Sequence, residues 1–318
     1  MHINSRYKKV KLIYNPKSGQ GNTLIPFFNR FLGIKHRHID LSKCPKECIQ
    51  KIQGYLNQFN IFPEVIQTTH PKHGTEIAKE CVRDTYDLVI VAGGDGSINE
   101  VINGLVNSSV ALGVIPLGTV NIYAIQTKIP LEIKAACQVI ATGLPTKIDL
   151  GKLNDHYFVC MAGIGFDANV IKKADSWLKK YISVLAYVLI GIQETFTYKF
   201  PPIYIQIDHQ KKYIQAVQVI VSNSNYYGGE LVIAKNAKMS DGLLDACIIK
   251  KLTLKRAIIS LLQMKQNQLE TSDYIDHIQC KTIRILNRGK HPMHIDAEYI
   301  GQSPATIKVM INALTIIK

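Results

Sequence analysis

The feature that most constrains the fold is an apolar run that leads directly into a glycine-rich turn. Residues 88–92 (LVIVA) are apolar at every position, which is typical of a parallel strand covered on both faces. Gly93, Gly94 and Gly96 follow within four positions, and residues 97–106 then show helical spacing. A buried strand, a turn and a helix in this order indicate an open α/β sheet, which binds ligands at the carboxyl ends of its strands.

The first half of the chain repeats this alternation. Strands are expected at residues 9–14, 62–67 and 110–115, and a helix at 73–83. Polar or glycine-bearing loops leave the strands at their carboxyl ends. We therefore expect a parallel sheet with crossover helices and a ligand site along one edge.

From about residue 147 the pattern changes to closely spaced strands with few helices. The expected strands are 147–153, 157–162, 203–208, 215–222, 244–249 and 282–286, with helical inserts near 168–194 and 253–266. The final run, 305–317, alternates as a strand does and is expected to return to the first domain. The predicted fold is an α/β nucleotide-binding domain, residues 1–147 plus 305–318, and a β-rich domain, residues 148–304.

Charge and composition narrow the class of partner. The chain has 318 residues, and 38 Lys+Arg against 24 Asp+Glu give a formal net charge of +14, which favours nucleotide, phospholipid headgroups or nucleic acid. No RNA-recognition aromatic motif or basic tail is present, so no nucleic-acid partner is expected. Seven cysteines without a CxxC pair argue against a disulfide framework, and the N-terminus lacks a signal-peptide pattern. We expect a cytoplasmic protein.

The most lipid-like run is residues 181–192 (YISVLAYVLIGI), which is shorter than the roughly 20 residues that span a bilayer. We expect either a buried helix or a helix beside a lipid entry groove. The preceding KKADSWLKK sets Trp177 among Lys172, Lys173, Lys179 and Lys180. This pattern is compatible with lipid-headgroup contact and equally with a solvated basic helix.

The glycine turn has the properties of a phosphate site. Glycines let the backbone approach a ligand, and the following helix N-terminus offers unpaired N–H groups and a positive dipole end. Asp95 would repel phosphate unless Mg²⁺ or a donor hydroxyl intervenes, so it indicates metal or ribose contact, with helix capping as the alternative. The turn is neither the GxGxxG nor the GxxxxGK[ST] motif.

With GGDGS at residues 93–97, the chain resembles the diacylglycerol kinase catalytic domain family, specifically the bacterial lipid kinases that also resemble sphingosine kinases. The family signature, GGDGT, differs only at Ser97. Further family motifs stand in order along the chain: NPxSG at 15–19, PLGTxN at 116–121, GxGxDA at 163–168 and NAxxxDGLLD at 236–245. The resemblance implies a Rossmann-like nucleotide domain of the NAD kinase and diacylglycerol kinase type, a β-sandwich-like second domain, and ATP and Mg²⁺ as cofactors.

The resemblance also implies a nucleotide site in the first domain. Its residues are Asn15, Thr68, Gly93, Gly94, Asp95, Gly96, Ser97, Ile98, Asn99 and Thr119. Hydroxyl groups and glycine N–H groups suit phosphate and ribose oxygens. Thr69 is the alternative to Thr68 if the loop is shifted by one residue, and local turn bonds are the alternative role for Thr68 and Thr119.

A Mg²⁺ site is implied at the DGLLD stretch. The implied ligands are the Asp241 side chain and the carbonyl oxygens of Lys238 and Leu243. Hard cations take oxygen ligands, which a DG turn can present. A plain hairpin turn capped by Asp241 is the alternative.

Asp296-Ala297-Glu298 corresponds to the family element DGE, whose glutamate is the expected general base. A carboxylate within hydrogen-bond reach of an alcohol can accept its proton as the O–P bond forms. We therefore expect Glu298 and Asp95 to be catalytic, with a surface or ion-paired role as the alternative for Glu298. Ala297 replaces glycine, which is harmless only if φ there is negative, and Ser97 replaces threonine; either change could signal a slow or repurposed enzyme.

Other polar clusters carry less weight. We expect His36, His38 and Asp40 to be solvated and Cys44 and Cys48 to be inert thiols. The polar-aromatic turn at residues 223–229 is either a loop lining a cleft or an ordinary hairpin connection.

The predicted function is an ATP-dependent lipid kinase that phosphorylates a diacylglycerol, phosphatidylglycerol or sphingoid hydroxyl in a cleft between the domains. Peripheral contact with an anionic membrane surface is expected from the charge. The alternatives are an NAD-kinase-like enzyme with a soluble acceptor and a non-catalytic lipid- or nucleotide-binding homologue. Neither the acceptor nor an oligomeric state is encoded in these motifs.

Overall fold

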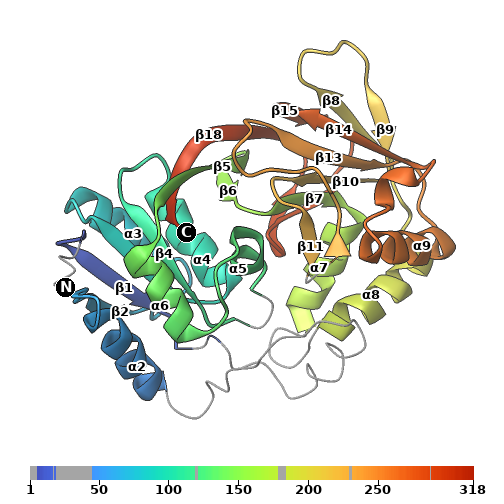
Figure 1. The fold of residues 1–318 in the computed structure, drawn as a ribbon. Helices are drawn as coiled ribbons and strands as arrows, with labels where there is room; N and C mark the ends of the chain where they lie inside the picture. Colours follow the sequence, from blue (N-terminus) through green and yellow to red (C-terminus); the bar gives the residue numbers. More distant parts are fainter. Residues whose placement is uncertain are drawn as a thin grey trace. The chain divides into compact units, whose positions relative to one another are not determined.

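A computed structural model describes residues 6–16, 18, 45–118, 121–177, 184–228, 231–286 and 288–318 (Figure 1). Their contacts divide the chain into two compact units. The first unit holds the described residues up to Ile148 together with Asn312–Lys318, and the second unit holds Asp149–Ile311.

A parallel sheet forms the core of the first unit. Its strands are β1 (Val10–Tyr14), β2 (Glu64–Gln67), β3 (Leu88–Gly93) and β4 (Ala111–Pro116), in the order β2-β1-β3-β4. β3 and β4 are buried at every residue, as the apolar run predicted. The end of β18 (Ala305–Ile317) pairs in parallel with β4.

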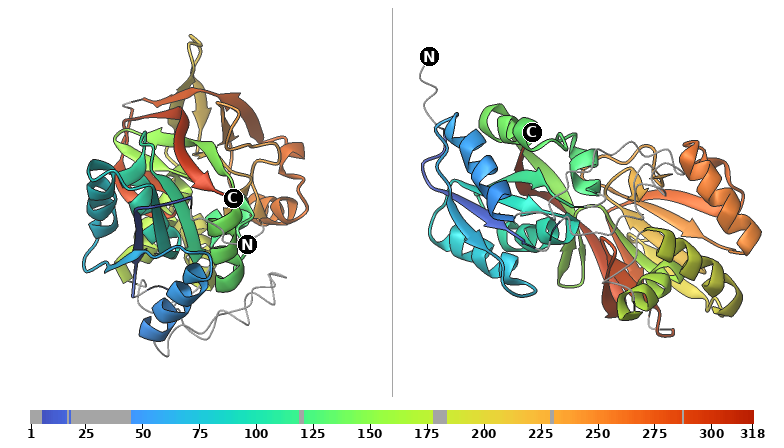
Figure 2. Two further views of the ribbon diagram at one scale, coloured as in Figure 1. Left: turned by 60° about the vertical axis from the view of Figure 1, so that its left-hand side comes forward. Right: turned by 90° about the horizontal axis from the view of Figure 1, so that it is seen from below.

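Helices cover both faces of this sheet. They are α2 (Pro45–Asn57), α3 (His73–Arg83), α4 (Asp95–Leu105), α5 (Ile122–Thr127) and α6 (Ile133–Thr142). α3 packs on α4 and α2 on α6, and Figure 2 shows the two pairs on opposite sides of the strands. α4 begins two residues earlier than predicted, so Asp95 and Gly96 lie in its first turn.

The second unit contains two mainly antiparallel sheets. One has the order β14-β13-β10-β7-β16-β17, and the other includes β18-β15-β8-β9, with β5 paired to β18 and β6. Their bounds are β5 (Pro145–Leu153), β6 (His156–Phe158), β7 (Met161–Gly165), β8 (Ile203–Ile207), β9 (Ile214–Ala216), β10 (Gln218–Ser222), β13 (Leu244–Ile249), β14 (Ile275–Cys280), β15 (Thr282–Ile285), β16 (Pro292–Ile295) and β17 (Glu298–Gln302). A short ribbon, β11 (Tyr226–Gly228) and β12 (Leu231–Val232), stands apart. Both sheets supply buried side chains to one core, for example Ile164 from β7 and Ile205 from β8. This confirms the predicted α/β domain plus β-rich, sandwich-like domain.

Helices α7 (Phe166–Trp177), α8 (Val184–Thr197) and α9 (Leu254–Lys265) belong to the second unit. α7 packs against β7 and β16, and α8 contacts both α7 and α9. Among the described residues, no helix combines the length and apolar character that crossing a membrane requires.

Two strand predictions need correction. The run 157–162 is divided between β6 and β7, because the backbone N–H groups of Val159, Cys160 and Met161 turn toward the Asp296 carboxylate. The run 215–222 is likewise divided between β9 and β10.

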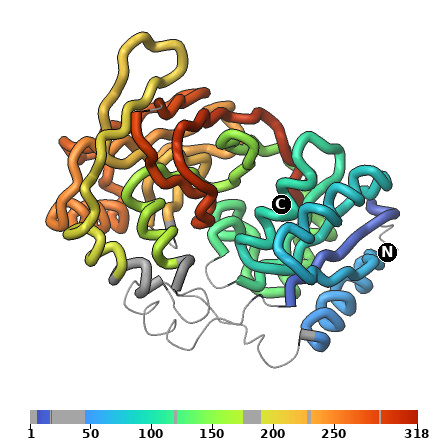
Figure 3. The backbone as a smooth tube through the Cα atoms, turned by 180° about the vertical axis from the view of Figure 1, so that it is seen from behind, coloured from blue at the N-terminus to red at the C-terminus, as the bar shows by residue number. Residues whose placement is uncertain are grey.

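The C-terminal strand also differs from expectation. We predicted that residues 305–318 join the nucleotide domain, whereas residues before Asn312 group with the second unit. β18 is 13 residues long, so its first residues pair with β15 and its last with β4. Figure 3 follows this strand to the C-terminus in the first unit.

Candidate active site

Loops from β1 and β3 meet at the carboxyl ends of these strands in the first unit. Asn15 Nδ2 donates to Ser97 Oγ at 2.8 Å, and the Gly94 N–H donates to Ser18 Oγ at 3.3 Å. Three predicted nucleotide residues, Asn15, Gly94 and Ser97, therefore belong to one cluster. This is the sheet edge at which open α/β folds bind ligands.

The loop after β4 joins the same cluster through a close backbone contact. A Cβ atom on Gly118 would lie 2.6 Å from the Cα atom of Gly94, so a larger residue at position 118 would push the two loops apart. A Cβ atom on Gly93 would lie 2.7 Å from Ser97 Cβ. Glycine is required at positions 93 and 118 because neighbouring atoms leave no room for a Cβ atom, whereas Gly96 faces open space.

Asp95 holds the loop after β4 in place. Its carboxylate accepts the N–H groups of Ile122 at 3.2 Å and Tyr123 at 3.1 Å, at the start of α5. Asn121 continues the link, because its side chain accepts from the Gly118 N–H and donates to the Gly118 carbonyl, both at 2.8 Å. A helix-capping role was the alternative for Asp95, and the helix that it caps is α5. Thr119 lies outside the described residues.

The remaining predicted nucleotide residues differ in their burial and in the hydrogen bonds that they make. Ile98 is buried, and its N–H already donates to the Gly94 carbonyl at 3.0 Å, so its side chain belongs to the core. Asn99 accepts from Asn103 Nδ2 at 2.9 Å. Thr68 is half-buried after β2, and its N–H donates to the Tyr14 carbonyl at 2.9 Å.

Glu100 connects the loop after β2 to α4, a role that no motif predicted. Its carboxylate accepts the N–H groups of Lys72 at 2.9 Å and Gly74 at 3.1 Å, while the Thr75 hydroxyl donates to the Glu100 carbonyl at 2.7 Å. The loop that carries Thr68 is thus anchored to the helix that follows the glycine turn.

In the second unit, the predicted metal turn is held by a buried carboxylate. The Gly242 N–H donates to Asp149 Oδ2 at 2.7 Å, and Asp149 is only 1% exposed. Asp241 is exposed, and its Oδ1 accepts the Leu243 N–H at 3.0 Å. Lys238 is exposed on the preceding segment. The turn therefore presents one outward carboxylate on a fixed backbone, and Asp149 is a supporting residue that sequence reasoning missed.

The polar turn after β10 is a structural connection for its first residues. Asn223 and Ser224 are fully buried, and Asn223 Nδ2 donates to the carbonyls of Asp149 at 2.9 Å and Val159 at 3.0 Å. These residues cannot line an open cleft.

The expected base follows a two-residue hairpin turn. β16 and β17 are joined through Asp296 and Ala297, and Ile295 pairs with Glu298. The φ angles are 43° at Asp296 and 65° at Ala297, the positive pair that a type I′ turn requires. The condition under which alanine would be harmless, a negative φ, is therefore not met. Glu298 is exposed at the first position of β17.

Asp296 fixes this turn to the body of the sheet. Its carboxylate accepts the N–H groups of Val159, Cys160 and Met161, each at 2.9 Å. Three charge-assisted hydrogen bonds of this kind are strong, because the acceptor is ionised. Asp296 therefore positions the turn that carries Glu298.

His294, two residues before Asp296, forms a buried pair with Asp167. His294 Nε2 is 3.0 Å from Asp167 Oδ2, and the side chains are 2% and 4% exposed. Gly163 makes room for both, because a Cβ atom there would collide with them. Asp167 belongs to the GxGxDA motif, whereas nothing in the sequence singled out His294.

Two lysines of the basic cluster before the lipid-like run make contacts within the second unit. Lys173 Nζ lies 2.6 Å from an oxygen of Glu194, which also accepts from Asn169 Nδ2 at 2.7 Å. Burial alone would raise the pKa of Glu194, but the hydrogen bonds from Lys173 and Asn169 leave it below its usual value. Lys172 Nζ lies 5.3 Å from the ring centroid of Tyr299. The Trp177 side chain, Lys179 and Lys180 lie outside the described residues, as do His36, His38, Asp40 and Cys44.

Both units contain residues that match known protein families. Residues 42–153 match the Diacylglycerol kinase catalytic domain, and residues 160–318 match the YegS C-terminal NAD kinase beta sandwich-like domain. A diacylglycerol kinase of Bacillus subtilis (strain 168) is 30% identical over 304 residues, which cover 93% of this chain and 92% of that protein. A diacylglycerol kinase of Staphylococcus epidermidis is 28% identical over 300 residues, covering 94% and 88%.

A solved structure agrees with these matches. The crystal structure of a candidate diacylglycerol kinase from Bacillus anthracis str. Sterne superposes with a TM-score of 0.74 at 25% identity, covering 99% of this chain and 98% of that one. The fold, the two domain matches and the 30% identical relative all indicate the same family. The chain belongs to the diacylglycerol kinase family of lipid kinases, which are phosphotransferases with an alcohol group as acceptor.

Proposed function

We propose that this lipid kinase transfers the γ-phosphoryl group of ATP to the hydroxyl of a membrane-derived lipid of the diacylglycerol, phosphatidylglycerol or sphingoid type. The observation that carries the proposal is the meeting of three loops at the strand ends of the first unit, joined by Asn15–Ser97, Ser18–Gly94 and Asp95–Ile122 hydrogen bonds. Fixed glycine N–H groups and hydroxyls beside a helix N-terminus suit a polyphosphate.

In this proposal ATP contacts Asn15, Thr68, Thr119 and the turn from Gly93 to Asn99. Asp95 keeps the turn and the loop after β4 together, so that both loops contact the nucleotide at fixed positions. Ile98 contributes through its backbone position, since its side chain is buried. Positioning and charge neutralisation supply most of the acceleration in phosphoryl transfer.

Mg²⁺ fits the turn at Asp241. The Asp241 side chain is exposed, and Asp149 fixes the backbone of the turn by accepting the Gly242 N–H. The proposed ligands are the Asp241 carboxylate and the carbonyls of Lys238 and Leu243 on the same segment. Oxygen donors of this kind are the ligands that magnesium prefers. Bound there, the ion would neutralise phosphate charge.

Glu298 is the proposed general base. Its carboxylate accepts the proton of the lipid hydroxyl while the new O–P bond forms and the bond between the γ-phosphorus and its bridging oxygen breaks, releasing ADP. The type I′ turn and the Asp296 hydrogen bonds hold the side chain at the start of β17, where it is exposed.

Glu298→Gln tests this assignment. The variant should fold and bind ATP normally and lose at least about 100-fold in kcat, the low end of the contribution of a general base. Glu270→Gln, an exposed glutamate of the same unit, is the matched control and should keep wild-type turnover. Near wild-type turnover by Glu298→Gln would remove Glu298 from the mechanism.

The acceptor class is tested with radiolabelled ATP and two acceptors, mixed lipid micelles and NAD. Label in lipid supports the proposal, and label in NAD supports a soluble-acceptor kinase. No transfer to either would favour a non-catalytic homologue.

We further propose that the enzyme is cytoplasmic and contacts anionic membranes peripherally through α8 and α9. Apolar side chains at helical spacing are exposed there, namely Ile192 and Phe196 on α8, and Ile258, Leu261 and Leu262 on α9, with exposed fractions of 44%, 73%, 50%, 41% and 56%. The exposed lysines Lys255 and Lys265 lie on the same α9. Apolar side chains flanked by lysines suit an anionic bilayer surface.

Vesicle co-sedimentation tests this surface. Binding should be stronger to vesicles rich in anionic lipid than to zwitterionic ones, and should fall at high salt. Leu262→Glu should weaken it, whereas Phe62→Glu, which changes an equally outward apolar residue of the first unit, should not. Salt-insensitive binding, or equal loss in both variants, would rule out α9 as the contact.

A further inference from the structure

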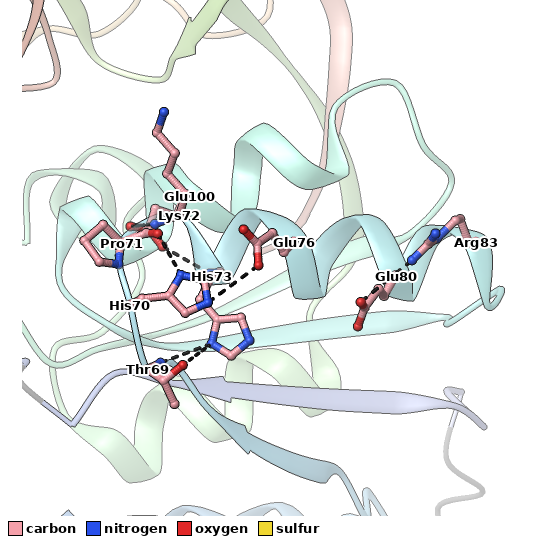
Figure 4. A network of polar contacts seen from close by, with 10 residues as sticks. Thr69, His70, Pro71, Lys72, His73, Glu76, Glu80, Arg83 and Glu100 are labelled. Carbon is pink, nitrogen blue, oxygen red and sulfur yellow. Dashed lines mark hydrogen bonds and ion pairs between the residues drawn. The ribbon is translucent and has the colours of Figure 1, made fainter.

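Two histidines and a glutamate gather at the start of α3, next to the loop that follows β2 (Figure 4). The candidate ligand atoms of His70, His73 and Glu76, one from each side chain, all lie within 4.8 Å of one another. His70 Nε2 is 3.7 Å from Glu76 Oε2, and the two imidazole rings are stacked with centroids 4.4 Å apart.

Local backbone structure produces this gathering. His73 and Glu76 are three residues apart in α3 and so share one face of the helix. The loop brings His70 back to that face, because the His73 N–H donates to the His70 carbonyl at 3.2 Å. Figure 4 shows the Lys72 side chain pointing away from the group, so its ammonium does not face the ligand atoms.

Hydrogen bonds at Nδ1 orient both rings, and the bond at His70 leaves Nε2 of that ring ready to bind a metal. His70 Nδ1 lies 3.1 Å from the Pro71 carbonyl, which fixes a proton on Nδ1 and leaves the Nε2 lone pair on the side of Glu76. The Thr69 N–H donates to His73 Nδ1 at 3.1 Å, and the Thr69 hydroxyl lies 3.2 Å from the same ring nitrogen. Since Nδ1 accepts this N–H, the neutral His73 ring carries its proton on Nε2. Binding a metal through Nε2 requires that proton to move to Nδ1, which then donates to the Thr69 hydroxyl in place of the amide contact. Partners of this kind orient histidines that bind metals.

We propose that His70 Nε2, His73 Nε2 and a carboxylate oxygen of Glu76 form a binding site for Zn²⁺ or a similar transition-metal ion, separate from the magnesium turn. Two imidazoles and a carboxylate, with the fourth position open to water, are a donor set that zinc takes, whereas magnesium prefers oxygen ligands.

Small side-chain rotations close the site. Zinc–ligand distances of about 2.0–2.2 Å set tetrahedral donors about 3.3 Å apart, so the three atoms must move inward. The side chains of His70 and Glu76 are 51% and 59% exposed and can rotate without disturbing the core. A bound ion would cross-link the loop to α3 and so stabilise the first unit.

Calorimetric titration of tag-free protein with Zn²⁺, in the presence of excess Mg²⁺, tests the proposal. Wild type should bind one equivalent and gain thermal stability, and Co²⁺ in place of zinc should give the visible absorption of a tetrahedral site. Loss of a supporting partner alone weakens metal binding about 10–100-fold, so the double variant His70→Ala/His73→Ala should lose at least about 100-fold in affinity. Its melting temperature should not rise when zinc is added.

Two further variants make the test decisive. His36→Ala/His38→Ala removes the same number of histidines from another paired-histidine segment and should bind zinc as wild type does. Glu76→Gln replaces an exposed side chain and should weaken zinc binding even if the double histidine variant fails to fold. The proposal is overturned by wild-type affinity in the His70/His73 and Glu76 variants, by loss of the site in the His36/His38 variant instead, or by the absence of saturable binding.

Discussion

Replacing Ala297 with glycine should stabilise the second unit, because alanine occupies the left-handed region there at φ 65°. This conformation costs a residue with a Cβ atom about 1–2 kcal/mol. The extra freedom of glycine in the unfolded chain offsets about 0.5–1 kcal/mol of that gain. The expected net change in the free energy of unfolding is therefore about 0.5–1 kcal/mol in favour of Ala297→Gly, which corresponds to roughly 1–4 °C in the melting temperature of a unit of this size.

Urea unfolding followed by circular dichroism measures the change. Ala257→Gly is the matched control, since it makes the same substitution inside α9 of the same unit and should destabilise by about 1 kcal/mol. The change in the free energy of unfolding should have opposite signs in the two variants, because Ala297 has a positive φ and Ala257 lies in a helix. A loss of stability in Ala297→Gly similar to that of the control would refute the reasoning. Because the backbone of the turn is unchanged, the variant should also keep Glu298 at the start of β17 and retain kinase activity.

Two further predictions concern buried or half-buried carboxylates. Asp95→Asn should destabilise the first unit by about 1–3 kcal/mol and weaken ATP binding, because an amide offers only one oxygen to the two N–H groups of Ile122 and Tyr123. Urea unfolding measures the stability, and nucleotide titration measures the binding. Unchanged values in both would contradict the anchoring role of Asp95. Burial raises the pKa of Asp245 to about 6, outweighing the hydrogen bond from Gln279, which lowers it. Since this acid has a higher pKa in the folded than in the unfolded chain, its contribution to stability is present below about pH 4 and is lost as pH rises through about 6. Asp245→Asn should flatten that fall, so the variant should gain stability relative to wild type at pH 7.5 but not at pH 4, as measured by urea unfolding.

Local chemistry explains which parts of the fold could be predicted from the sequence. The run at residues 88–92 predicted a fully buried strand, and the helix predicted at residues 73–83 coincides with α3. The start of α4 was placed two residues late, because glycine and aspartate have low helix propensity and hid its first turn. The six-residue α5 was not predicted, since its N-terminus is held by Asp95 from the first turn of α4 and not by a capping pattern of its own.

The supporting residues of the candidate site could not be predicted, because each acts at long range in sequence. Asp149 binds the N–H of Gly242, and Asp296 binds N–H groups of residues 159–161. His294 of β16 pairs with Asp167 in the first turn of α7. None of these contacts produces a periodicity or a local spacing, whereas the glycine motifs and the DAE element do.

These supporting contacts also explain how a β-rich unit can present exposed carboxylates at fixed positions. Asp241 and Glu298 both face outward on turns, where a side chain would ordinarily follow a mobile backbone. A second, more enclosed carboxylate restrains each turn: Asp149 accepts the Gly242 N–H, and Asp296 accepts the N–H groups of residues 159–161. An ionised acceptor makes stronger hydrogen bonds than a neutral one, so each turn is restrained by charge as well as by strand pairing. The outward carboxylate is then left with few competing contacts on a restrained backbone, which is the combination that metal binding and proton transfer both require.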